Sequence, residues 1–83
     1  MRFKARVEVS LKPGHSDPEG ETTARALREL NYPVKNVGVS KVYTVFFEAS
    51  SKTEAEEMVD EMCRRLLANP TKDDYKFEVE EIE

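Results

Sequence analysis

The stretch from Thr53 to Pro70 constrains the fold more than any other part of the sequence, because it combines a clear helical periodicity with a defined end. Its apolar residues recur every three or four positions, so they share one helical face that needs a sheet to cover it. Asn69 suits a left-handed cap and Pro70 cannot continue a helix, so the helix should stop at Ala68 or Asn69. The predicted apolar face consists of Ala55, Met58, Val59, Met62 and Leu66, with Cys63 and Leu67 beside it.

The two leucines near the end of this helix, Leu66 and Leu67, are both expected to bury against the sheet. The opposite face is charged and is predicted to face water. It contains two acid–base pairs four residues apart, Asp60 with Arg64 and Glu61 with Arg65, in the order that stabilises a helix.

Residues 2 to 12 alternate strictly between apolar and polar side chains, which is typical of a strand with one buried face. A strand of this length is about twice the usual one. We therefore expect it either to extend past its own sheet or to pair with a second chain. The side predicted to be buried consists of Phe3, Ala5, Val7, Val9 and Leu11.

A second helix is predicted to begin at the sequence Asp-Pro-Glu-Gly, residues 17 to 20. Asp17 suits the N-cap, Pro18 the first helical position, and Glu19 the positive end of the helix dipole. The helix should end near Asn31, with Tyr32 and Pro33 as the stop. Its apolar stripe is narrow and consists of Thr23, Ala24, Leu27 and Leu30.

Residues 34 to 49 are rich in β-branched and aromatic side chains, which favours a strand. Their alternation is imperfect, because Val42 and Phe46 make the second face partly apolar. Either the strand is long and covered on both sides, or a bulge or turn near Gly38 to Lys41 divides it into a hairpin. Both alternatives predict more apolar surface than one small domain covers, and therefore a partner.

The final strand is predicted from the alternation of Tyr75, Phe77 and Val79 with charged residues. The order of elements is then β-α-β(β)-α-β. This order predicts an α+β fold, in which an antiparallel sheet carries two helices on one face, ferredoxin-like in plan. At 83 residues, the chain should form a single domain over residues 1–83, close to the size at which one core is only marginally sufficient.

The formal net charge of −4 argues against nucleic-acid binding, which relies on basic side chains facing phosphates, and against membrane surfaces. The single cysteine cannot form an intrachain disulfide. No apolar run is long enough for a signal peptide or a membrane span. We therefore expect a reducing, cytoplasmic setting.

The sequence does not assemble an active site. His15 lies in a predicted loop without a second ligand or nucleophile beside it, so an exposed loop histidine is favoured over an acid or base. Cys63 is expected to be a buried, inert thiol. No metal-binding spacing occurs, and Gly14, Gly20 and Gly38 are too scattered to form a phosphate-binding loop.

Several motifs resemble the PurS family, the small subunit of phosphoribosylformylglycinamidine (FGAM) synthase. They are the Asp17–Gly20 helix start, the Ala26–Leu27 pair, the sequence Cys-Arg-Arg-Leu-Leu-Ala-Asn-Pro at residues 63 to 70, and Asp74–Tyr75. The resemblance spans nearly the whole chain. It implies a non-catalytic subunit in de novo purine biosynthesis, which holds together a glutaminase subunit and a large synthetase subunit on which ATP and Mg act. It implies no cofactor on this chain.

The resemblance also implies self-association into a dimer or tetramer through the sheets. We expect loops positioned by a rigid scaffold to contact the larger subunits, in particular residues 14 to 20 and 71 to 74. The candidate partner-contact or loop-positioning residues are Asp17, Pro18, Gly20, Asn69, Pro70, Asp74 and Tyr75. Which surface meets which subunit is left open.

Two other interpretations stay open beside the assembly subunit. One is a small-ligand-binding regulatory module of ferredoxin-like type. The other is a stand-alone enzyme of acylphosphatase-like type, for which the Pro13 to Ser16 loop would be a poor phosphate-binding loop.

Overall fold

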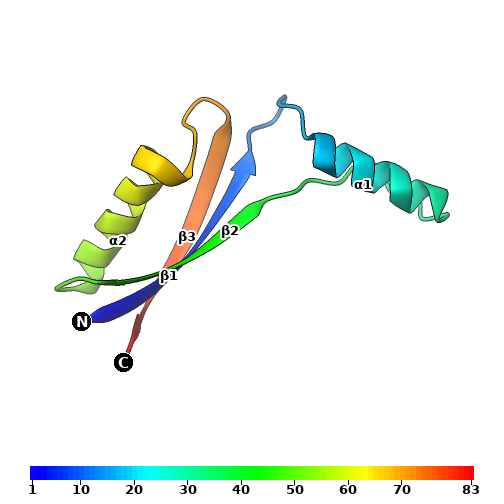
Figure 1. Ribbon diagram of the computed structural model, residues 1–83. Coiled ribbons are helices and arrows are strands. Elements are labelled where there is room, and N and C mark those ends of the chain that lie inside the picture. The colour runs from blue at the N-terminus through cyan, green and yellow to red at the C-terminus, as the bar shows by residue number, and fades with distance from the viewer.

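The computed structural model describes residues 1–83 and contains one antiparallel sheet and two helices. The strands lie in the order β2-β1-β3 across the sheet (Figure 1). The α+β class and the antiparallel sheet are confirmed. Along the chain the elements are β1 (Arg2–Leu11), α1 (Pro18–Glu29), β2 (Lys41–Glu48), α2 (Lys52–Met62), a short π-helical turn η1 (Cys63–Leu67) and β3 (Asp73–Ile82).

The central strand β1 carries the core. Its alternating apolar side chains are buried, as predicted, with Phe3 and Val7 fully enclosed. Phe3 stacks on Phe47 of β2 at 6.0 Å between ring centroids. The expectation that β1 extends past its own sheet or pairs with a second chain is wrong, because β3 is equally long and pairs with it from Arg2 to Leu11.

The helix α2 covers the inner face of the sheet, defined here as the face that bears Phe3. Its buried side chains are Ala55 and Val59, followed by Cys63 in η1. Two hydrogen bonds hold the start of the helix: the hydroxyl of the N-cap residue Ser51 accepts from the Glu54 N–H at 3.1 Å, and the Glu54 carboxylate accepts from the N–H of the preceding residue, Ser50, at 3.0 Å. The predicted helix therefore exists, although its buried face centres on Val59 and Cys63.

The end of this helix differs from the prediction. The Ala68 N–H donates to the Cys63 carbonyl at 2.9 Å, five residues back, which widens the last turn. The wider turn rotates Leu66 into solvent, where 82% of it is exposed, while Leu67 packs against the core. The predicted burial of Leu66 is thus wrong. The left-handed cap at Asn69 is also wrong, since Asn31 is the non-glycine residue with positive φ.

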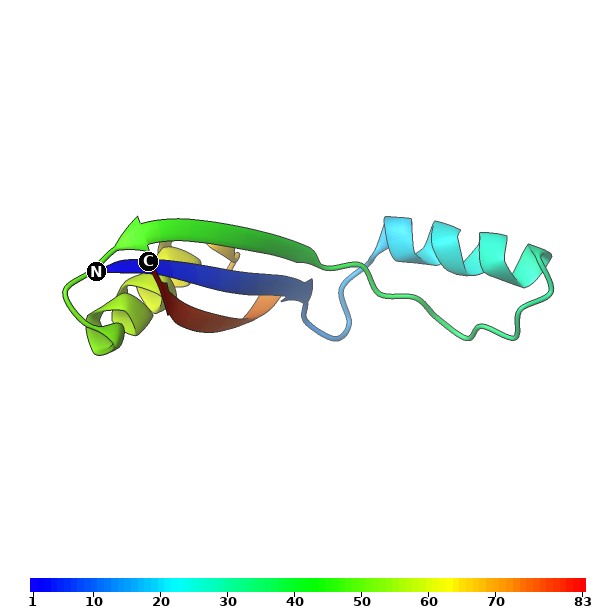
Figure 2. The same cartoon turned by 90° about the horizontal axis from the view of Figure 1, so that it is seen from below.

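The helix α1 lies beyond the end of the sheet, in an arm formed by residues 12–40 (Figures 1 and 2). The radius of gyration is 16.4 Å, against about 12 Å for a compact chain of this length. The prediction that both helices lie on one face of the sheet is therefore wrong for α1 within a single chain. Local periodicity shows which side of a helix is apolar but not which surface will cover it. Neither helix has the length and apolar character needed to cross a membrane.

Residues 34–49 form neither the long strand nor the hairpin that the sequence allowed. The strand β2 occupies only Lys41–Glu48. Residues 34–40 run beside α1 as an extended segment without a neighbouring strand.

Two adjacent leucines provide a test of the π-helical turn. We expect Leu66→Ala to change the free energy of unfolding by less than about 0.5 kcal/mol, because the side chain is exposed. Leu67→Ala should cost about 1–3 kcal/mol, because its contacts with the core are lost. Urea unfolding followed by circular dichroism measures both. Equal costs for the two variants would contradict the observed rotation of Leu66.

Candidate functional site

Both predicted loops lie at the same end of the sheet. The Lys12 N–H donates to the Lys72 carbonyl at 2.7 Å, which joins the loop before α1 to the turn before β3. Between them is an open hollow of about 220 Å³, lined in part by Asp17, Val39 and Leu67. We call the surface formed by residues 12–20 and 69–73 the loop end.

Asp17 fixes the start of the arm. One carboxylate oxygen accepts from the Gly20 N–H and the other from the Val39 N–H, each at 2.9 Å. Both bonds lower the pKa of Asp17, and the bond from Gly20 has the larger effect. Gly20 lies so close to Val37 that a Cβ there would collide with the Val37 carbonyl oxygen. Pro18 occupies the first turn of α1 as predicted, so these three residues together position the arm.

Asn69 organises the turn that leads into β3. Its carbonyl accepts from the N–H groups of Lys72 and Asp73 at 3.2 and 2.8 Å. Its side-chain oxygen accepts from the Thr71 N–H at 2.9 Å, and its own N–H donates to the Asp73 carboxylate at 2.9 Å. Pro70 is exposed within this turn. Four hydrogen bonds thus hold the turn together, and its contact with a partner stays a prediction.

The last two candidates, Asp74 and Tyr75, lie on opposite faces of β3. Asp74 is exposed and pairs with Lys12 at 3.6 Å. The Tyr75 hydroxyl donates to Asp60 of α2 at 2.6 Å, and Arg64 holds the other oxygen of Asp60 at 2.8 Å. Tyr75 therefore ties α2 to the sheet, away from the loop surface that the candidates were expected to share.

The bond between Tyr75 and Asp60 was not foreseen from the sequence, which indicated only the pairing of Asp60 with Arg64. The hydrogen bond from the Tyr75 hydroxyl has the largest effect on the pKa of Asp60, which it lowers, and the bond from Arg64 lowers it further. The same bond raises the pKa of Tyr75. No spacing rule would have revealed this contact, because the two residues meet only once α2 lies on the sheet.

The two side chains that the sequence offered for chemistry, His15 and Cys63, lie in different environments. His15 is exposed in the loop before α1. Cys63 is fully buried in the core, and its burial, with a smaller effect of Asp60, raises the pKa of its thiol. No group of three or more His, Cys, Asp or Glu side chains is arranged to hold a metal ion. His15 and Cys63 thus lie in different settings, one exposed in a loop and the other enclosed in the core.

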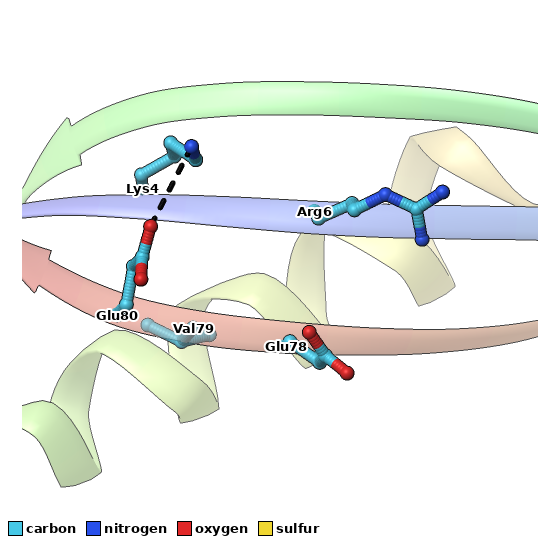
Figure 3. Close-up of a pocket in the computed structure, with 5 residues that line it drawn as sticks. All are labelled: Lys4, Arg6, Glu78, Val79 and Glu80. Carbon is cyan, nitrogen blue, oxygen red and sulfur yellow. Dashed lines mark ion pairs between the residues drawn. The ribbon is translucent and has the colours of Figure 1, made fainter.

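On the outer face of the sheet, basic side chains of one strand lie opposite acidic side chains of its neighbour. Lys4 and Arg6 stand on β1 opposite Glu78 and Glu80 on β3, around an open hollow of about 330 Å³ (Figure 3). Lys4 and Glu80 form an ion pair at 3.5 Å. Small-ligand pockets are usually enclosed, apolar and equipped with a few converging polar groups. This exposed row of charges does not favour the regulatory-module interpretation.

The PurS family model, described as phosphoribosylformylglycinamidine (FGAM) synthase, matches residues 4–81 of this chain. A phosphoribosylformylglycinamidine synthase subunit PurS from Methanocaldococcus jannaschii is 43% identical over 82 residues, which are 98% of this chain and 99% of that protein.

Two solved structures are similar over the same length. The structure of Thermus thermophilus PurS has a TM-score of 0.89 at 37% identity, covering 100% of both chains. A chain in the structure of PurLQS from Thermotoga maritima has a TM-score of 0.86 at 34% identity, covering 96% of this chain and 99% of that chain.

The Tyr75–Asp60 bond generates a prediction about pH. Tyr75→Phe should lower the melting temperature by a few degrees at neutral pH, because the ionised Asp60 loses a donor. A carboxylate whose pKa is lowered by folding stabilises the protein above its unfolded pKa, and this contribution is lost as pH falls through the folded pKa. The difference between parent and variant should therefore shrink as pH falls below the ordinary aspartate value of 3.8.

Thermal unfolding monitored by circular dichroism across this pH range measures the effect. Tyr43→Phe is the matched control, because Tyr43 lies on the same face of the sheet without a bond to Asp60. A difference that stays constant down to the lowest pH would contradict the role given to Asp60.

Proposed function

The chain belongs to the PurS family, and we propose that it is the non-catalytic assembly subunit of phosphoribosylformylglycinamidine synthase in de novo purine biosynthesis. In this role it bridges the glutaminase subunit and the large ATP-dependent synthetase subunit. The observation that carries the proposal is the full-length similarity to a chain in the PurLQS structure. The reaction converts formylglycinamide ribonucleotide, glutamine and ATP into formylglycinamidine ribonucleotide.

Within this proposal the chemistry resides on the two larger subunits. The glutaminase releases ammonia, and the synthetase uses ATP and Mg to activate the nucleotide. This chain contributes neither a cofactor site nor a catalytic group. The burial of Cys63 and the isolated, exposed position of His15 support that division. The proposed location is the cytoplasm, which agrees with a single, unpaired cysteine.

We assign the contact with the larger subunits to the loop end. The bonds made by Asp17 and Asn69 hold its two loops in fixed positions before any partner binds. Preorganised loops lose less conformational freedom on binding, so more of the contact energy is available for affinity. The exposed Leu66 lies in η1, directly before this turn, and adds an apolar contact of the kind that interfaces bury.

Reconstitution with the two larger synthase subunits tests the function. The tagged chain should retain both subunits on an affinity column, and adding it should raise glutamine-dependent turnover of formylglycinamide ribonucleotide at least tenfold over the two larger subunits alone. Failure of the chain to bind either subunit, or unchanged turnover on its addition, would refute the assembly role.

Disrupting the turn before β3 tests the assignment of the loop end. Asn69→Ala combined with Pro70→Ala removes the bond to Thr71 and frees the backbone. We expect glutamine-dependent turnover to fall by about tenfold, which corresponds to the loss of about 1.4 kcal/mol, with ammonia-dependent turnover nearly unchanged. Only the glutamine-dependent reaction needs the glutaminase to be docked. Lys52→Ala, at the other end of α2, is the control. Equal glutamine-dependent rates for double variant and parent would show that the turn is purely structural.

A further inference from the structure

The arm carries basic side chains that no carboxylate of the chain neutralises. The ion pairs of the molecule involve the sheet, α2 or η1, and none reaches into the arm beyond Lys12. Arg25, Arg28 and Lys35 therefore form no ion pair, and all three are exposed. In a chain with a net charge of −4, an excess of positive charge is thus concentrated at one place.

These three cations surround an open hollow of about 260 Å³ between α1 and the returning branch of the arm (Figure 2). The residues that line it include the three cations, Asn36 and a single carboxylate, that of Glu21. Positive charge therefore exceeds negative charge in this hollow. The hollow at the loop end is different, because its two lysines are outnumbered by three carboxylates. Complementary charge favours an anionic ligand with about two negative charges for the hollow on the arm.

The Arg28 side chain is held in place before any ligand binds. Its Nη1 atom donates to the carbonyl of Val34 at 3.2 Å and to the carbonyl of Lys35 at 3.3 Å. Its Nη2 and Nε groups donate no hydrogen bond within the chain. They stay free for a carboxylate, which the planar guanidinium group binds through two parallel hydrogen bonds. Because Arg28 is already fixed, its binding costs less conformational entropy.

The basic side of α1 is separate from its apolar side. Thr23 and Leu30 are seven residues apart and share the apolar side. Arg25 and Arg28 are each two residues from one of them and five from the other. With 3.6 residues in each turn, both arginines lie about 140–160° away from that side around the helix axis. A ligand on the basic side therefore leaves the apolar residues free to be covered separately.

We propose that this hollow, which we call the arm site, binds an acidic segment of the large synthetase subunit through two carboxylates. The inference rests on the proposed function. A chain that bridges two subunits needs a surface for each of them. Disrupting the turn at Asn69 is expected to affect docking of the glutaminase, so the arm site is the second surface and belongs to the synthetase.

A protein segment fits the arm site better than a free small anion does. Ion pairs that stay exposed contribute little, because water and salt screen them. A docked protein surface excludes water, which strengthens the attraction between the same charges, and arginine is enriched in such interfaces. A membrane or a nucleic acid has an extended negative charge, which would also meet the carboxylates of Glu21 and Glu29 on the same helix.

Zero-length cross-linking in the reconstituted three-subunit complex tests the contact directly. A carbodiimide condenses a lysine amine with a carboxylate when the two groups touch. Lys35 should therefore become joined to an aspartate or glutamate of the synthetase, as identified by mass spectrometry of the peptides. Lys35→Arg is the matched control, because it keeps the positive charge and removes the amine. It should bind like the parent and give no cross-link at residue 35.

Charge reversal measures how much the arm site contributes to binding. Lys35→Glu should raise the dissociation constant for the synthetase at least about fivefold, since it places like charges against each other. Its amine makes no bond within the chain, so the arm stays folded. Arg25→Glu combined with Arg28→Glu should raise the constant at least about thirtyfold. Biolayer interferometry at about 0.1 M salt measures both, and the effects should shrink at about 1 M salt, where the Debye length falls to about 3 Å.

The control for charge reversal is Arg2→Glu combined with Lys52→Glu. It changes the net charge of the chain as much as the double arginine variant does. Both of its positions are exposed, lack an ion pair and lie at the end of the sheet opposite the arm. The dissociation constant of this control should stay within about twofold of the parent value, because screened charges far from an interface contribute little.

The outcomes separate this proposal from the proposed function. A parent chain that binds neither larger subunit would refute both. If the parent assembles, the arm site is refuted alone when Lys35 cross-links only to the glutaminase or to a second copy of the chain. It is also refuted alone when the arm variants bind the synthetase as tightly as the control that combines Arg2→Glu with Lys52→Glu.

Discussion

Pairing of β1 on both of its sides is the constraint on which the rest of the structure depends. A strand flanked on both sides satisfies all of its backbone groups, and its alternation then fixes which face of all three strands is apolar. Phe3, Ala5, Val7 and Val9 bury because they share that face. The helix α2 covers the same residues, so the core, the helix and the position of Tyr75 all follow from the register of one strand.

A second constraint acts where the chain leaves the sheet. The carboxylate of Asp17 bonds two N–H groups that lie far apart in sequence, on Gly20 and Val39. The outgoing and returning branches of the arm are thereby joined at its base. This junction gives α1 a defined direction although little of the helix touches the rest of the chain. The separate bond from the Lys12 N–H to the Lys72 carbonyl holds the loop before α1 beside the turn at Asn69, and together these contacts shape the proposed surface for the larger subunits.

The sequence was most informative where structure is decided locally. The cap at Asp17 and the alternation of β1 and β3 depend on neighbouring residues, and they were predicted. The helix that was expected to stop at Ala68 or Asn69 ends slightly earlier, at Leu67. Leu66 was misplaced because a π-helical turn changes the angle between successive side chains, which a regular period does not represent. The position of α1 was missed because it depends on surfaces distant in sequence. The Tyr75–Asp60 bond was missed for the same reason.

The buried thiol of Cys63 has a consequence of a different kind. It lies at the junction of α2 and the π-helical turn, fully enclosed, with its pKa raised by burial. A thiol reagent can reach it only when the helix separates from the sheet. When reclosing is faster than modification, the rate of alkylation reports the equilibrium between closed and open forms. The chain therefore contains a natural chemical probe for the detachment of α2, and no label has to be introduced.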